Sequence, residues 1–175
     1  MTSIHVSKLD AARRQLEISI RLYFSNADPV SIHTLAAAGY NIVRDVGVKR
    51  AANPMFLKEQ LLDDVLPNAR KLVRDKLNEA ENFFKHADRD HQAVFDFDPA
   101  LTELFILDAC DQYYRLTGEA PPLFKVFRSW FVANHPDWFA AERLGAVKSQ
   151  APEFVALGRA GFFQQMLPLA HVLQA

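Results

Sequence analysis

Residues 66–91 read LPNARKLVRDKLNEAENFFKHADRDH, and this stretch carries the clearest helical periodicity of the chain. Its apolar residues recur at spacings of three and four; they are Leu66, Val73, Leu77, Ala80, Phe84 and Ala87. Polar residues fall on the opposite face: Asp75, Asn78, Asn82, His86 and Arg89. The pattern predicts a long amphipathic helix that starts at Pro67 and runs to about residue 87.

Start and stop signals for further helices lie on both sides of this stretch. Ser7 is a suitable N-cap for a helix over residues 8–25, and Asp28-Pro29 begins a helix that runs to about residue 46. Asp98-Pro99 repeats that start for a helix over residues 99–117, which Gly118 ends. We expect a loop at 47–54 and a short helix at 54–66.

The C-terminal third predicts three more helices. Pro121-Pro122 begins one, residues 136–144 form a short one, and the last covers 152–167 until Pro168 breaks or kinks it. With short connections throughout, these elements predict an all-α fold. We expect a single helical domain over residues 1–175, an irregular bundle of six to eight helices.

The composition limits the classes of function. The net charge is -1, which argues against a broad phosphate-binding surface. The only cysteine, Cys110, lies in an apolar run and is expected to be a small core residue. The six glycines form no phosphate-binding loop, so no nucleotide cofactor is expected. We see no signal peptide and no membrane-spanning run, so a cytoplasmic location is expected.

Asn82 and His86 are the first candidates for chemistry. Four residues make just over one helical turn, so both side chains are expected on one face of the helix. An imidazole beside an amide that orients it can act as a general base. The alternative is that these residues are only the solvated face of an amphipathic helix.

The same residues resemble an incomplete HEPN motif. HEPN domains are small all-helical bundles, often dimeric, and many are metal-independent RNases. Their motif is an arginine followed after four to six residues by a histidine, commonly with asparagine directly after the arginine. Asn82 and His86 match the asparagine and the histidine. The resemblance implies binding of RNA or a nucleotide, or RNA cleavage, with His86 as general base and Asn82 orienting it.

Glu81 stands where the HEPN motif has its arginine. A carboxylate there repels the charge that develops on a phosphate, whereas a guanidinium stabilises it. Three other basic residues, Arg89, Arg44 and Lys85, are the candidates for neutralising a phosphate.

His33, Tyr40 and Arg44 share a face of the second helix and are candidates for supporting a polar cleft with His86. The alternative is that His33 and Tyr40 are partly buried core residues. The segment Ile32–Leu35, taken together with Asn82–Asp90, is similar to sequences of a family of small uncharacterised bacterial all-helical proteins. That similarity implies no particular chemistry.

A metal site is the third reading. His86, Asp88, Asp90 and His91 offer imidazole and carboxylate ligands within six residues. They can converge only if the helix ends near Ala87, and no established metal-binding motif occurs. This reading makes the protein a metal-dependent hydrolase.

The segment from Phe124 to Phe139 contains more large aromatic side chains than a helix at the edge of a bundle needs for packing. They either close the core or form a dimer surface, since interface cores are rich in aromatics. We expect a homodimer, and a non-catalytic module that binds a partner protein is the alternative to RNA binding. On the central helix, Asp111 and Arg115 are spaced to form an ion pair.

Overall fold

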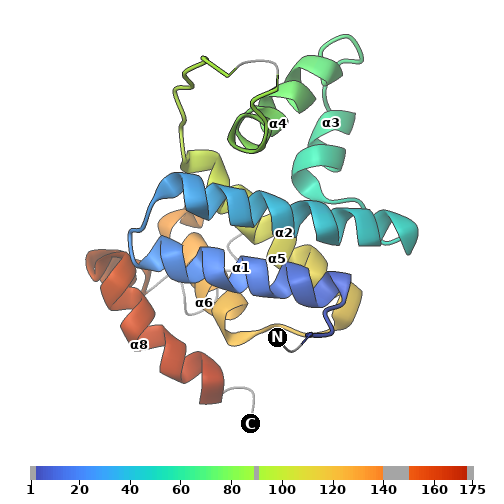
Figure 1. The fold of residues 1–175 in the computed structure, drawn as a ribbon. Coiled ribbons are helices and arrows are strands. Elements are labelled where there is room, and N and C mark those ends of the chain that lie inside the picture. The colour runs from blue at the N-terminus through green and yellow to red at the C-terminus, as the bar shows by residue number, and fades with distance from the viewer. Residues whose placement is uncertain (1–2, 89–90, 140–149, 173–175) are drawn as a thin grey trace.

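A computed structural model of the chain describes residues 3–88, 91–139 and 150–172. These residues form helices and connections, with no strand among them, so the predicted all-α bundle is confirmed (Figure 1). The helices, in chain order, are α1 (Lys8–Phe24), α2 (Pro29–Lys49), the π-helix η1 (Phe56–Gln60), α3 (Leu61–Asp63), α4 (Arg70–Lys85), α5 (Ala100–Thr117), α6 (Pro122–Asn134), the 3-10 helix η2 (Pro136–Trp138) and α8 (Gly158–Val172). Residues 150–156 are also helical.

Helices α1 and α2 form an antiparallel pair at the front of Figure 1. Both start at the predicted caps: Ser7 Oγ accepts from the Asp10 amide at 3.0 Å, and Asp28 accepts from the Ser31 amide at 2.7 Å. A Cβ on Gly39 would lie only 2.8 Å from Leu16 Cγ. Glycine is therefore needed for this close approach of the two helices.

The inner bundle consists of α1, α2, α5, α6 and α8 (Figure 1). Its centre is aromatic: Phe24 and Phe127 are buried, and Trp130 donates its indole N–H to the Tyr23 hydroxyl at 2.9 Å. The aromatic residues of α6 thus close the core, which is one of the two roles predicted for them. Trp138 differs, because 62% of its surface is exposed.

The outer layer, residues 55–88 and 91–98, comprises η1, α3, α4 and the segment that leads to α5. It lies against α2 at the top of Figure 1. Only Leu77 and Glu81 of α4 are buried. The expected apolar stripe is therefore wrong at its ends, where Leu66 is 72% exposed and Ala87 is also exposed. The reason is that α4 packs on α2, α3 and η1 along its middle and has no inner core of its own to fill.

Several predicted boundaries are also wrong. Helix α2 continues to Lys49, because Gly47 packs directly against the side chain of Gln112. The helix predicted over 152–167 is interrupted by a turn at Leu157, and α8 then runs from Gly158 past Pro168 to Val172, with Ala170 buried in the core cluster. The predicted end at Gly118 is confirmed by its positive φ of 74°. Of the predicted 136–144 helix, residues 140–144 lie outside the described residues.

Within the described ranges, every helix is too short or too polar to cross a membrane.

Candidate functional site

A groove with a volume of about 680 Å³ runs along α4. Residues 93–95 form its opposite wall. We call it the α4 groove. Its lining residues are Leu72, Asp75, Lys76, Glu79, Asn82, Phe83, His86, Asp88, Ala93, Val94 and Phe95. Asn82 and His86, the two residues of the predicted motif, thus line the same groove.

The geometry of His86 differs from the prediction. Helix α4 ends at Lys85, and His86 is its C-cap, with extended backbone angles φ -130° and ψ 135°. Its amide donates to the Asn82 carbonyl at 3.1 Å, which is the last i to i−4 hydrogen bond of α4, and the chain leaves the helix at His86. Both side chains are exposed, and within the described part of the chain no hydrogen bond joins them.

The α4 groove is acidic. Asp75, Glu79 and Asp88 contribute three carboxylates, against one ammonium from Lys76. Lys76 pairs with Glu79 at 2.9 Å, and Lys71, outside the groove, pairs with Asp75 at 2.5 Å. Because exposed pairs of this kind are weak, a basic group on a bound partner can compete with Lys71 and Lys76 for these two carboxylates.

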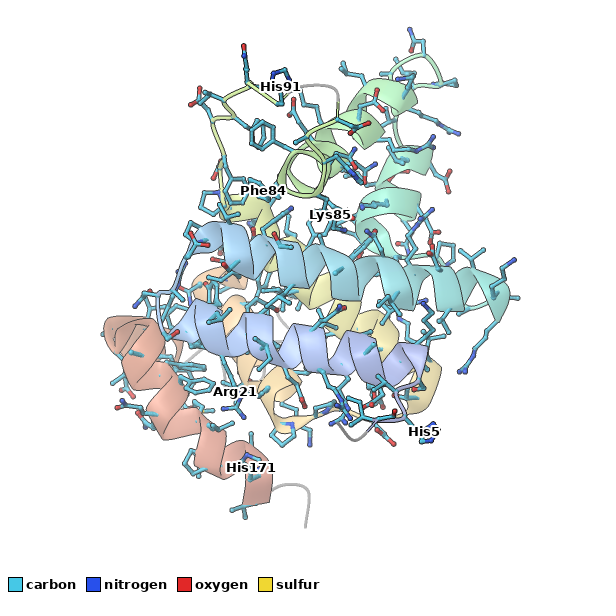
Figure 2. The ribbon with its side chains drawn as sticks, viewed as in Figure 1. His5, Arg21, Phe84, Lys85, His91 and His171 are labelled. Atoms are coloured by element: carbon cyan, nitrogen blue, oxygen red, sulfur yellow. The ribbon has the colours of Figure 1, made fainter. Side chains whose placement is uncertain are left out.

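Of the residues predicted to bind phosphate, Arg44 and Lys85 do not line this groove. Arg44 lies 3.4 Å from Glu59 and 3.6 Å from Asp45. Lys85 Nζ lies 2.6 Å from Glu81 Oε1, on the side of α4 that faces α2 (Figure 2). Arg89 lies outside the described residues. The phosphate-binding roles stay predictions.

A buried polar network joins α4 to the rest of the molecule. Glu81 accepts from the Lys58 ammonium at 3.3 Å, from Lys85 and from the amide of Asn41, and Lys58 also donates to Asn41 Oδ1 at 3.0 Å. Lys58 and Glu81 are both 7% exposed. The Lys58 ammonium also lies 5.1 Å from the centre of the Phe105 ring. We call this set the Lys58–Glu81 network.

Burial and pairing shift both pKa values in this network. Burial lowers the pKa of Lys58, and the charge of Glu81 offsets only part of that effect. For Glu81, burial alone would raise the pKa. The hydrogen bonds from Lys85 and Asn41 and the charge of Lys58 outweigh it, so the pKa of Glu81 is lowered. Glu81 is therefore ionised at neutral pH, with Lys58 Nζ 3.3 Å from its Oε2 atom.

Asp108 holds the start of η1 against α5. Its two carboxylate oxygens accept the backbone amides of Phe56 and Leu57, each at 3.0 Å. Burial raises the pKa of this carboxyl group despite these bonds. Nearby, the predicted pair of Asp111 with Arg115 is wrong, because Asp111 pairs with Arg128 of α6.

His33 and Tyr40 are buried below α4 and do not line the groove. His33 Nδ1 lies 3.0 Å from Thr102 Oγ1, while its Nε2 has no partner within the described residues. Burial lowers the pKa of His33 to about 4, so its ring is neutral near pH 7. The Tyr40 hydroxyl accepts the amide of Lys58 at 3.2 Å, and burial raises its pKa. Both residues support the outer layer from beneath.

The cluster proposed for a metal does not assemble from its described members. Among the residues that the structure describes, no three His, Cys, Asp or Glu side chains come together to hold a metal ion. The side chain of His91 lies at the outer end of the molecule and points away from the body of the protein (Figure 2). Asp90 lies outside the described residues. Cys110 is buried, and burial raises the pKa of its thiol, as suits a core residue.

The sequence reasoning missed Lys58, Asn41 and the buried role of Glu81. Glu81 lies about one helical turn after Leu77 on the buried face, so the helical period itself places it inward. Nothing local in the sequence identifies Lys58 as its partner, because the two are 23 residues apart.

No protein-family model matches this chain, and comparisons with curated proteins and with solved structures find no match.

Proposed function

We propose that the protein is a binding module, that the α4 groove is its recognition surface, and that the occupant is a segment of a partner protein with basic and apolar side chains. The observation that carries this proposal is the combination, in one groove, of exposed apolar side chains with an excess of carboxylates.

The apolar part of the groove is open to a partner. Leu72 is 64% exposed and Val94 is 93% exposed, while Phe83 and Phe95 are half-buried beside them. The ring centroids of Phe83 and Phe95 lie 5.2 Å apart, so the two side chains pack against each other and form the apolar base of the groove. Exposed apolar side chains that adjoin a hollow are typical of interaction sites.

Charge selects the kind of partner. The carboxylates of Asp75 and Glu79 line the same groove as the apolar side chains, and their exposed pairs with Lys71 and Lys76 can be exchanged for lysine or arginine on the occupant. The same carboxylates disfavour a nucleic acid backbone. A segment that alternates basic and apolar side chains satisfies both parts of the groove.

Selection from a displayed library of random peptides tests the proposal. We expect the selected peptides to be enriched in Lys or Arg together with Leu or Phe. Binding of a selected peptide, measured by fluorescence anisotropy, should weaken by about tenfold or more in Glu79→Lys and in Leu72→Asp. It should also weaken with added salt.

Asp64→Lys is the matched control, because Asp64 is exposed, lies outside the groove and makes the same change of charge. This variant should bind the peptide as the wild type does. Peptides without basic residues, or equal losses in Asp64→Lys and Glu79→Lys, would contradict the proposal.

RNA cleavage without a metal is the second candidate, and it is favoured by Asn82 and His86 lining one groove, both exposed. In this HEPN-like role His86 acts as general base and Asn82 orients it. Purified protein is incubated with RNA, with and without EDTA, for wild type and His86→Ala. Cleavage that survives EDTA and is lost in His86→Ala supports this candidate. Cleavage that is lost with EDTA supports the metal-dependent hydrolase, and no cleavage at all contradicts both.

We further propose a cytoplasmic location and a homodimer. The molar mass of the purified protein, measured by light scattering, tests the homodimer. A mass of two chains supports it, and a mass of 19.8 kDa, that of one chain, contradicts it.

A further inference from the structure

A second hollow, with a volume of about 380 Å³, lies between α5 and α6. We call it the α5–α6 hollow. It is lined by Cys110, Asp111, Tyr114, Arg115, Ala120, Phe124, Lys125 and Arg128. None of these residues lines the α4 groove, so a ligand bound here would be independent of the function proposed for that groove.

The charge of this hollow is opposite to that of the α4 groove. Three cations, Arg115, Lys125 and Arg128, line it with a single carboxylate, Asp111. Asp111 is already paired with Arg128. Within the described residues, the side chains of Arg115 and Lys125 make no hydrogen bond and no ion pair. Two cations without a bonded partner among those residues thus line one small concave site.

Lys125 is half-buried, which removes part of the hydration of its side chain. It also lies in the first turn of α6, where the helix dipole favours an anion. An anionic ligand would compensate both effects. Because a guanidinium binds phosphate oxygens through two parallel N–H groups, Arg115 suits a phosphate well.

The other side chains that line the hollow offer apolar surface beside these charges. Tyr114 is 55% exposed, and Phe124 and Cys110 form a buried floor behind it. An exposed ring next to cations suits a flat organic group attached to the anion. The volume is within the range that holds small molecules in proteins.

We propose that the α5–α6 hollow binds a small organic phosphate, with its phosphate group on Arg115 and Lys125 and its ring against Tyr114. The probe is AMP, because it combines a phosphate with a flat ring. Adenosine provides the ring alone and inorganic phosphate provides the anion alone.

Isothermal titration calorimetry at low salt measures the binding. We expect AMP to bind with a Kd below about 1 mM, more tightly than inorganic phosphate, and adenosine not to bind. Arg115→Ala and Lys125→Ala should each weaken AMP about tenfold. Tyr114→Ala should weaken AMP while leaving inorganic phosphate unchanged.

Arg74→Ala and Lys49→Ala are the matched controls, since both residues are exposed cations outside the hollow. They should bind AMP as the wild type does, and circular dichroism checks that every variant is folded. Failure of AMP to bind would overturn the proposal, as would equal losses in the controls. Binding of inorganic phosphate as tight as that of AMP would overturn the organic part of it.

Discussion

The inner bundle and the outer layer of this protein are held together by different interactions. The inner bundle buries aromatic side chains such as Phe24, Phe127 and Trp130 against one another. The outer layer buries only Leu77 and Glu81 of α4, and it is joined to α2 through the Lys58–Glu81 network and through the half-buried rings of Phe84 and Phe97, which contact His33. At the surface of the outer layer, the exposed side chains of Leu72 and Val94 line the α4 groove.

This difference indicates a division of roles. Apolar burial is strong but not directional, and it gives the inner bundle its stability. An ion pair with hydrogen bonds costs more to desolvate but fixes one geometry for the helix that carries it. The outer layer can therefore hold α4 in position while leaving its apolar side chains free for a partner.

Truncation in the inner bundle should give the largest loss of stability. Phe127 is fully buried, so Phe127→Ala should lower the free energy of unfolding by about 3 to 5 kcal/mol. Urea denaturation measures this loss. The matched control in the outer layer is Phe56→Ala, because Phe56 is 50% exposed and its loss should be much smaller. Equal losses would remove the distinction between the two regions.

Breaking the Lys58–Glu81 network should give a smaller loss. Lys58→Met removes one partner of a buried ion pair, which ordinarily costs about 3 to 5 kcal/mol. Because Lys85 and Asn41 still bond Glu81, we expect a loss of about 2 kcal/mol here. In Lys58→Met with Glu81→Met no buried charge is left, so part of the loss should be regained. A double variant less stable than Lys58→Met would contradict this account.

Acid should weaken the same network. The pKa of Glu81 is lowered from its ordinary value of 4.5, so its contribution to stability is fully present above pH 4.5 and is lost as the pH falls through the lower, folded value. The melting temperatures of wild type and Glu81→Gln should therefore differ most above pH 4.5 and converge in stronger acid. A constant difference across that range would show that Glu81 is not charged in the fold.

His86→Ala should have the smallest effect on stability. His86 is exposed at the end of α4, and its side chain makes no hydrogen bond within the described residues, so the change should stay within about 0.5 kcal/mol. Urea denaturation checks this. A larger loss would mean that His86 supports the outer layer, and its role in any binding or cleavage assay would then need to be judged against that instability.

Local signals in the sequence predicted much of the fold. Ser7, Asp28 and Gly118 begin or end helices as expected, because caps and left-handed glycines act within a few residues. The ends of α4 were wrong, since apolar periodicity alone does not say whether a neighbouring element is present to cover the stripe.

The candidate site was harder to predict than the fold. The spacing of Asn82 and His86 in the sequence correctly placed both at one groove. For Glu81, however, the sequence showed only that it replaces the arginine of the HEPN motif, and it did not predict that Glu81 is buried. Its burial depends on Lys58 and Asn41, which reach it from other helices, and no local pattern reports such contacts. The opposite charges of the two hollows likewise arise from packing, because the overall net charge is only -1.

Hydrogen exchange of wild type and Lys58→Met, resolved along the chain by mass spectrometry, tests the division of roles most directly. We predict that the amides of α4 exchange faster in Lys58→Met, while those of α1 and α5 keep the protection that they have in the wild type. A uniform rise in exchange across α1, α4 and α5 would contradict the account, because the outer layer and the inner bundle would then open as one unit.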